Sequence, residues 1–264
     1  MARIMTCKNR INSYEDLADD IIKWISDYNW FHSIGALVVG VSGGIDSAVV
    51  ATLCAKTGLK TYVVSMPLAS SAEDDRLSDD YTKALAEKYD NVERVRVELS
   101  SVYRALHSSI EVWNGFTGRE QKEFTTNDLA NANTKSRIRM LALYQIAGSV
   151  DGIVVGTGNK VEDYGIGFFT KYGDGGVDIA PIADLLKTEV WFLGEYLEVD
   201  ERICEATPTD GLWNDGRKDE DQIGATYEQL EEAMQHGTGP AVDILNSYKS
   251  KNKHKMEPIP TFKL

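Results

Sequence analysis

The sequence lacks the features of membrane-spanning, exported and disulfide-linked proteins. No apolar run reaches the roughly 18 residues that a membrane-spanning helix needs, and the N-terminal segment contains no apolar signal core. The cysteines Cys7, Cys54 and Cys204 are scattered and form no CxxC or Cys/His spacing. We therefore expect a cytoplasmic protein with free thiols, no membrane contact and no structural zinc.

Positive charge is also scarce. Lys and Arg number 28 against 41 Asp and Glu, which gives a net charge of −13 at pH 7. This excess of negative charge argues against a nucleic acid or an anionic membrane as a partner, so an anionic ligand needs local positive charge or a metal ion. With 264 residues, 42% of them hydrophobic, the chain suits one large α/β domain better than two small ones.

The stretch Ala36–Gly58 carries the clearest structural signal. Apolar, β-branched residues at Ala36–Val41 predict a buried strand, and Ala48–Lys56 predicts a helix that ends at Gly58. The turn between them, Ser42–Ser47, is small and contains two glycines. The first N–H groups of a helix have no partner within the helix, and the helix dipole favours negative charge there. A strand, a glycine-rich turn and a helix start therefore predict an anion site, although an ordinary turn with a Ser/Asp cap uses the same residue types.

The rest of the chain predicts strands that alternate with helices. Further strands are expected at Lys60–Pro67, Val92–Leu99 and Gly152–Gly156. Helices are expected at Ser13–Asp27, Tyr81–Lys88, Asn133–Ala147, Pro181–Tyr196 and Tyr227–His236. The apolar face of the third helix comprises Ile138, Leu141, Ala142 and Ile146. This order predicts an α/β fold in which one parallel sheet carries helices on both faces.

Three polar segments are expected to be loops. Leu68–Asp80 is rich in small and acidic residues. This composition fits either a mobile loop at the carboxyl edge of the sheet or a solvated loop that leads into a helix. Phe168–Ile179 is rich in glycine and acidic residues, which predicts a specialised loop. Thr207–Gly224 is long, polar and acidic, which predicts a lid or a disordered loop.

Two common phosphate-binding motifs are absent from the Ser42–Ser47 turn. It has no lysine where a Walker A loop needs one, and it lacks the GxGxxG pattern of dinucleotide-binding folds. Its sequence, SGGIDS, instead resembles the SGGxDS pyrophosphate loop of the ATP pyrophosphatases. Those enzymes cleave ATP between the α and β phosphates and activate a substrate as its adenylate. The loop alone also allows GMP synthetases, argininosuccinate synthetases and tRNA-modifying relatives.

More distant motifs narrow this resemblance. FFTKYGDGG at Phe168–Gly176, followed by Asp178, resembles the signature of the ammonia-dependent NAD synthetases. The N-x-K-x-R pattern at Asn133–Arg137, the pair Pro208-Thr209 and the pair His254-Lys255 support it. The resemblance covers nearly the whole chain.

The resemblance implies a complete reaction. That family amidates deamido-NAD with ammonia, uses ATP as co-substrate with Mg²⁺, and releases NAD, AMP and pyrophosphate through an adenylate intermediate. It also implies a single domain over residues 1–264 with an adenine nucleotide α-hydrolase-like, Rossmann-like fold, no glutaminase domain, and a homodimer.

The resemblance further assigns roles to individual residues. Asp46 and Lys187 match catalytic positions, and Asp46 and Glu162 match the metal ligands. Lys187 is expected near the middle of the helix Pro181–Tyr196, where residue type alone would favour a surface lysine. The positions that match ATP-binding residues are Gly40, Val41, Ser42, Gly43, Gly44, Ile45, Asp46, Ser47, Thr157, Lys187 and Thr209. Those that match the deamido-NAD site are Arg137, Lys171, Asp178, His254 and Lys255.

Some residues and alternatives stay open at this stage. Gly158 and Asn159 stand where many bacterial members have Asp and His, and one extra residue follows Glu162, so we expect altered loop geometry with the same reaction. Arg139 is more readily a solvated arginine than Arg137. The alternatives are another adenylating amidase with this loop, or a non-catalytic nucleotide-binding module. The acidic composition argues against a tRNA substrate, and the intact loop argues against the module.

Overall fold

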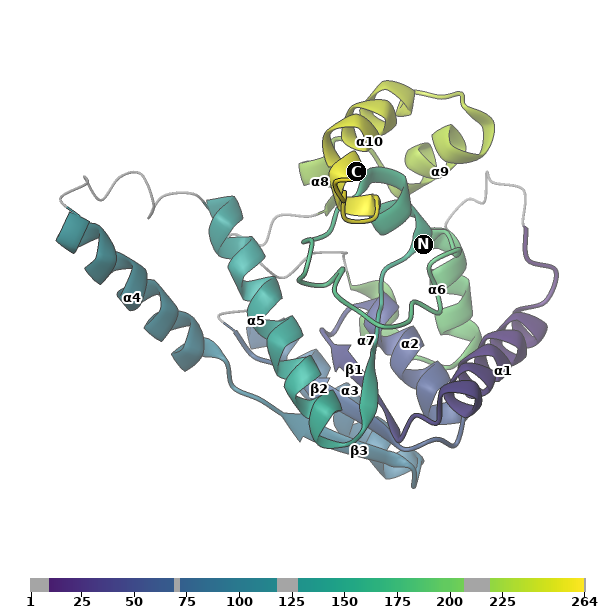
Figure 1. Ribbon diagram of the computed structural model, residues 1–264. Helices are drawn as coiled ribbons and strands as arrows, with labels where there is room; N and C mark the ends of the chain where they lie inside the picture. The colour runs from purple at the N-terminus through teal and green to yellow at the C-terminus, as the bar shows by residue number, and fades with distance from the viewer. Residues whose placement is uncertain (1–9, 69–71, 118–127, 207–218, 264) are drawn as a thin grey trace.

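A four-stranded parallel sheet forms the centre of the protein. The computed structural model describes residues 10–68, 72–117, 128–206 and 219–263. The strand order is β3-β2-β1-β4, with parallel pairing throughout, and the sheet lies in the lower half of Figure 1. The strands are β1 (Ala36–Val41), β2 (Thr61–Ser65), β3 (Val92–Arg96) and β4 (Gly152–Val155). The chain builds outward from β1 to β3 and then places β4 on the other side of β1, so the strand order reverses there.

Residues of β1 explain why helices cover both faces of the sheet. Alternate side chains of a strand point to opposite faces, and Leu37, Val39 and Val41 belong to one buried core with α1 (Tyr14–His32) and α2 (Ile45–Lys56). Val38 belongs to a second buried core, on the side of α5 (Asp128–Ser149). A strand that is buried on both faces has to be apolar throughout. The predicted α/β fold, one parallel sheet between two helical layers, is confirmed.

The first helices show where local signals succeed and where they fail. Helix α1 begins after Ser13, whose Oγ accepts a hydrogen bond from the backbone N–H of Asp16 over 3.1 Å. The expected loop at Leu68–Asp80 is wrong over most of its length, because α3 (Ala72–Lys88) already begins within it. Glu73, Asp74 and Asp75 lie in the first turn of α3, where negative charge complements the helix dipole.

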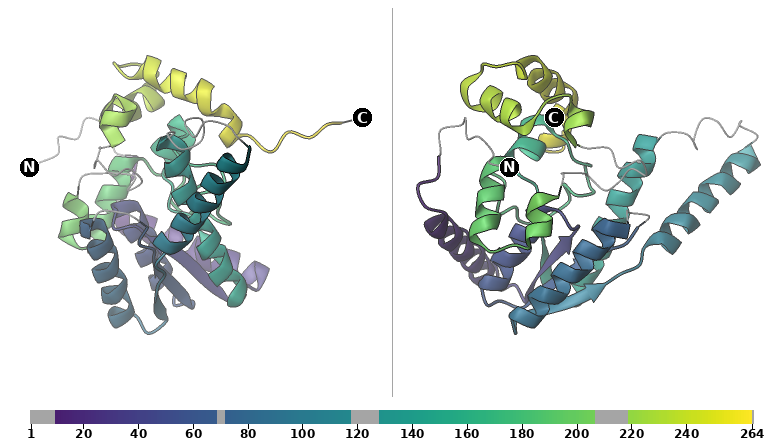
Figure 2. Two further views of the ribbon diagram at one scale, coloured as in Figure 1. Left: turned by 90° about the vertical axis from the view of Figure 1, so that its left-hand side faces the viewer. Right: turned by 180° about the vertical axis from the view of Figure 1, so that it is seen from behind.

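Helix α4 (Ser100–Thr117) forms an arm at one side of the molecule, and α5 lies between it and the sheet. The arm projects from the sheet in Figures 1 and 2. Helix α5 is longer than expected and buries Ile138 and Ala147 against the sheet. Leu141, expected on the buried face, is instead 63% exposed, because the sheet contacts a neighbouring stripe of the helix.

The C-terminal elements form a layer above the carboxyl end of the sheet. They are η2, a π-helical segment (Lys160–Ile166), α8 (Asp219–Ile223), α9 (Tyr227–His236) and α10 (Val242–Met256). Helices α6 (Lys187–Tyr196) and α7 (Glu201–Glu205) instead pack beside α2. Helices α9 and α10 pack on η2, and the chain after α10 extends away from the body in Figure 2. Within the expected lid Thr207–Gly224, residues 207–218 lie outside the described part, and α8 follows them. Among the described helices, none combines the length and the apolar character needed to cross a membrane.

Candidate functional site

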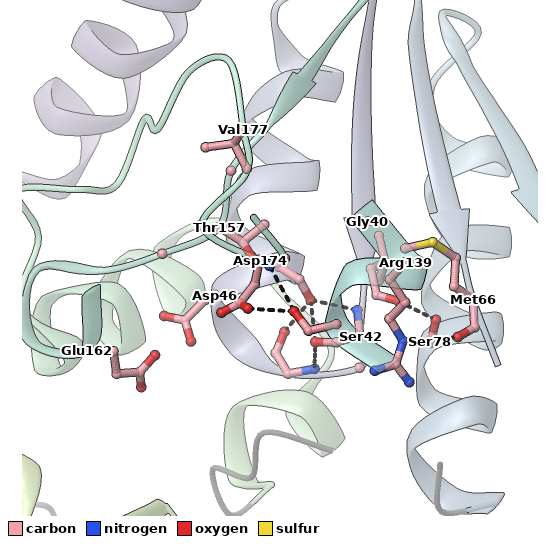
Figure 3. Close-up of a pocket in the computed structure, with 18 of the residues that line it drawn as sticks. Gly40, Ser42, Asp46, Met66, Ser78, Arg139, Thr157, Glu162, Asp174 and Val177 are labelled. Atoms are coloured by element: carbon pink, nitrogen blue, oxygen red, sulfur yellow. Dashed lines mark hydrogen bonds between the residues drawn. The ribbon is translucent and has the colours of Figure 1, made fainter. Parts of the chain in front are cut away.

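A pocket of about 290 Å³ lies where the strand order reverses. Gly40–Ser47, the end of β1 and the turn after it, line one wall, and Gly156–Gly158, which follow β4, line the adjacent wall. Figure 3 shows Gly40, Met66, Ser78 and Arg139 toward one end and Glu162 at the other, with Asp46, Thr157 and Asp174 between them. Ligands of open α/β sheets bind at this position, outside the carboxyl ends of the strands.

The Ser42–Ser47 turn is held by its own hydrogen bonds. Ser47 Oγ accepts from the Ser42 N–H over 3.1 Å and donates to the Gly44 carbonyl over 2.9 Å. Gly43 has φ +95°, and a Cβ on it would lie 2.9 Å from the Asp74 carbonyl oxygen, so no other residue fits there without strain. Gly44 is the N-cap of α2 and offers no side chain to its first N–H groups. These N–H groups are therefore available to an anion in the pocket.

Three charged side chains from three elements meet at the floor of the pocket. Lys187 Nζ donates to Asp46 Oδ2 over 2.5 Å and to Glu162 Oε1 over 2.9 Å. Burial raises the pKa of Asp46 above its usual value, although the Lys187 ammonium opposes that shift. Burial also acts to lower the pKa of Lys187, but Asp46 and Glu162 outweigh it and raise that pKa. Lys187 therefore stays protonated, as a fixed positive charge between two carboxylates.

The start of α6 explains how Lys187 reaches this position. It is the first residue of α6 rather than a residue near the middle of a helix from Pro181, so that expectation is wrong. Glu189 and Glu231 hold this helix start, because Glu189 Oε2 accepts from the Leu186 N–H over 2.8 Å and Glu231 Oε1 accepts from the Thr188 N–H over 2.9 Å. Lys187 is only 3% exposed. The sequence favours a surface lysine because this burial depends on tertiary packing.

Asn159, noted as a departure from the family pattern, links the Asp46 carboxylate to the backbone at Glu162. Its Oδ1 accepts from the N–H groups of Val161 and Glu162, each over 3.0 Å, which caps η2. Its Nδ2 donates to Asp46 Oδ1 over 3.2 Å. A side chain on Gly158 would overlap the Asp163 carboxylate, so glycine gives Asp163 its space. Asn159 thus helps to hold Asp46 and the start of η2 in place.

Residue-level reasoning from the sequence missed further carboxylates that line the pocket, among them Asp163 and Asp174. Asp174 Oδ1 accepts from Ser136 Oγ over 2.6 Å and from the Thr170 N–H over 2.9 Å. Burial raises the pKa of both carboxyl groups above the usual range. The acidic GDGG run was the available signal for Asp174, and no local pattern indicated Asp163.

The two arginines of α5, Arg137 and Arg139, have the reverse of the expected exposure to solvent. Arg139 lines the pocket, and its Nε donates to the Met66 carbonyl over 3.3 Å. Arg137 is exposed and donates to the Lys171 carbonyl over 3.3 Å. The expectation that Arg139 is the solvated one is therefore wrong. Residues 137 and 139 lie on different faces of the helix, and only the packing of α5 decides which face meets the pocket.

The residues expected at the deamido-NAD site lie beside the pocket rather than on its described lining. Arg137 contacts Lys171, and Lys171 Nζ donates to the His254 carbonyl over 2.8 Å, so these three form one cluster. Lys255 Nζ donates to the carbonyls of Gly167 and Phe169. The fifth residue, Asp178, accepts from Tyr144 and from the Val154 N–H. Of the ATP-binding expectations, Thr157 lines the pocket, and Thr209 lies outside the described residues.

The sheet, the turn and the pocket define a nucleotide-binding protein of the pyrophosphate-loop class. The family model described as NAD synthase matches residues 17–260. An NH(3)-dependent NAD(+) synthetase of Carboxydothermus hydrogenoformans is 38% identical over 249 residues, which cover 93% of this chain and 96% of that protein. The chain belongs to the NAD synthase family.

Solved structures show the same fold over nearly the whole chain. An NMN synthetase from Francisella tularensis superposes with a TM-score of 0.85 at 30% sequence identity and covers 96% of this chain and 100% of its own. The NH3-dependent NAD synthetase from Campylobacter jejuni, in complex with a nitrate ion, gives a TM-score of 0.73 at 24% identity, with coverage of 96% and 100%. The second similarity supports the fold alone.

Proposed function

We propose that this chain is a ligase that amidates deamido-NAD with ammonia at the expense of ATP, giving NAD, AMP and pyrophosphate. One observation carries the proposal: the SGGIDS turn, the helix-start lysine Lys187 and the carboxylates of Asp46 and Glu162 converge in one pocket. A non-catalytic module would need an anion site but not this buried charge cluster. The family membership and the ammonia-dependent relatives support the same reaction.

The reaction has two steps that the residues can support by position and charge. A nicotinate carboxylate oxygen attacks the α phosphorus of ATP, the bond to the β phosphate breaks, and pyrophosphate leaves. Neutral ammonia then attacks the activated carbonyl carbon and loses a proton, and AMP leaves with the former carboxylate oxygen. The N–H groups around Gly44 bind phosphate oxygens, and Lys187 places positive charge where negative charge separates.

The carboxylates of Asp46 and Glu162 also fit Mg²⁺. Asp46 and Glu162 already enclose a cation, the Lys187 ammonium, which shows that their carboxylates converge on a site of positive charge. Asp46 and Glu162 would hold Mg²⁺, with phosphate oxygens and water as its other ligands. No group of three or more metal-ligating side chains occurs among the described residues, so the nucleotide has to complete the coordination. The bound ion would neutralise phosphate charge.

A smaller acceptor is the second candidate. The Francisella tularensis structure, an NMN synthetase, covers this chain with a TM-score of 0.85, which favours nicotinic acid mononucleotide as an alternative to deamido-NAD. Lys171 and Lys255, expected to bind the dinucleotide, donate to backbone carbonyls of the chain itself. The chemistry at the carboxylate is the same for both acceptors.

One assay decides between these acceptors and between nitrogen donors. The purified protein is incubated with ATP, Mg²⁺, either deamido-NAD or the mononucleotide, and either ammonium chloride or glutamine. We expect NAD and AMP in equal amounts from deamido-NAD, and rates with ammonium that rise with pH because only neutral ammonia has a free electron pair. Cys54 is buried with its pKa raised to about 12, which makes it a poor nucleophile for glutamine. Preferential turnover of the mononucleotide would make it, rather than deamido-NAD, the acceptor of this enzyme. AMP formation without any acceptor would contradict the proposed amidation.

The arm suggests how a homodimer forms. Val102, Leu106 and Ile110 make one exposed apolar stripe of α4, and Leu141 is exposed on α5. Clustered exposed apolar side chains on a projecting arm are typical of subunit interfaces, so we place the contact with a second copy there. Free Cys54 and the use of ATP support a cytoplasmic location.

A further inference from the structure

Tyr227 connects the C-terminal helices to the charged floor of the pocket. It is the first residue of α9, is 1% exposed, and lies 65 positions from Glu162 in the chain. Its hydroxyl donates to Glu162 Oε1 over 2.6 Å. Lys187 Nζ donates to the same oxygen over 2.9 Å. Two donors from different helices therefore fix the rotation of this one carboxylate.

The surroundings leave Tyr227 little freedom to move. Its ring meets Trp191 edge-to-face with centroids 5.7 Å apart, and Lys187 Nζ lies 5.2 Å from the ring centroid. Its backbone N–H donates to Glu220 Oε1 over 3.0 Å, which ties the start of α9 to α8. The hydroxyl is thus held at a set distance from Glu162 by contacts that do not involve Glu162.

We propose that Tyr227 is a positioning residue that orients Glu162 for the divalent cation of the nucleotide. This rests on the proposed function, in which Asp46 and Glu162 hold that cation. Hydrogen bonds to a metal-ligating carboxylate set its geometry, and their loss typically weakens metal binding or activity by 10- to 100-fold. Tyr227 acts through Glu162, so its hydroxyl matters for the cation more than for the acceptor.

The test compares Tyr227→Phe with Tyr248→Phe as the matched control. Tyr248 is a partly buried tyrosine of α10, and its hydroxyl donates to the Gln222 carbonyl over 3.1 Å, away from Glu162. Binding of Mn²⁺ with the non-hydrolysable analogue AMPCPP is measured by electron paramagnetic resonance, without acceptor and without turnover. We expect the dissociation constant for Mn²⁺ to rise on the order of tenfold in Tyr227→Phe and to stay unchanged in Tyr248→Phe. In turnover assays, excess Mg²⁺ should restore most of kcat to Tyr227→Phe.

A double-mutant cycle with Glu162→Ala separates positioning from general damage to the fold. If the hydroxyl acts through Glu162, adding Tyr227→Phe to Glu162→Ala should weaken Mn²⁺ binding no further. Equal affinities of wild type and Tyr227→Phe, or full additivity in the cycle, would overturn the inference. If the wild-type protein itself fails to bind Mn²⁺ with AMPCPP, the proposed function is contradicted as well. Failure of the role of Tyr227 and failure of the proposed function therefore give different results.

Discussion

The amine of Lys187 lies 2.5 Å from Asp46 Oδ2, although 141 positions separate the two residues in the chain. One side chain starts helix α6 and the other lies in the first turn of α2. Helices α2 and α6 pack against each other. The contact therefore joins the Ser42–Ser47 turn to the element that supplies positive charge, and it places that charge beside the helix N-terminus proposed to bind phosphates.

Asp46→Ala should abolish turnover, even at saturating Mg²⁺, because it removes one of the two carboxylates proposed to hold the cation. The fold should persist, since Lys187 keeps its hydrogen bond to Glu162. The measurement is NAD formation together with circular dichroism. The control is Asp27→Ala, which removes only a surface pair with Lys23 and should leave the rate unchanged. Near-normal NAD formation by Asp46→Ala would contradict the assignment.

Gly43→Ala should weaken ATP binding strongly. A Cβ there would lie 2.9 Å from the Asp74 carbonyl, and φ is +95°, so the turn must shift. Gly58→Ala is the matched control, because Gly58 also has positive φ (+74°) but no atom within 4 Å of its Cβ. That control should lose about 1 kcal/mol of stability and bind AMPCPP normally in calorimetry. Equal nucleotide affinity in the two variants would show that the close approach of Asp74 is unimportant.

The sequence could predict the parts of this fold that local signals determine. The β1 strand, the SGGIDS turn and the α9 bounds agree with the sequence pattern, because each depends on apolar runs, glycines or caps within a few residues. The α3 start was missed although Glu73 and Asp74 are typical of a first helical turn, since the small residues before them resemble a loop.

Long-range packing explains what sequence reasoning could not reach. Which of Arg137 and Arg139 faces the pocket depends on how α5 rotates against the sheet. The contact of Tyr227 with Glu162 joins elements far apart in the chain, and no pattern near either residue signals it. The roles expected for Arg137, His254 and Lys255 remain predictions, because they depend on a bound acceptor.

The stability of the protein should fall as the pH rises toward neutrality because of Glu231. Burial raises its pKa from 4.5 to about 7, although its carboxylate accepts hydrogen bonds from Thr188. Since the folded pKa exceeds the unfolded one, this group's contribution is complete below about pH 4.5 and is lost as pH rises through about 7. The loss is on the order of 3 kcal/mol. Glu231→Gln should flatten the pH dependence of the melting temperature between those two pH values. Glu232→Gln, at an exposed position, should leave that pH dependence unchanged. Parallel profiles for Glu231→Gln and wild type would disprove the shift.

Leu106→Glu should convert a dimer into a monomer. A charge in the apolar stripe of α4 would be buried without a partner at the proposed contact. Light scattering after size-exclusion chromatography measures the mass. Trp30→Glu, at a 76% exposed position of α1, should leave the dimer intact. A monomeric wild type would contradict the proposed dimer. Loss of the dimer only in Trp30→Glu would place the contact on α1 instead of α4.

The fate of the acceptor's carboxylate oxygens tests the adenylation chemistry most directly. Deamido-NAD labelled with ¹⁸O in both carboxylate oxygens is incubated with the enzyme, ATP, Mg²⁺ and ammonia. Mass spectrometry then measures the ¹⁸O content of each product. Attack of the carboxylate on the α phosphorus requires that AMP carry one labelled oxygen and that the NAD amide keep the other. AMP without label, or ADP and phosphate in place of AMP and pyrophosphate, would contradict an adenylate formed at the Ser42–Ser47 turn.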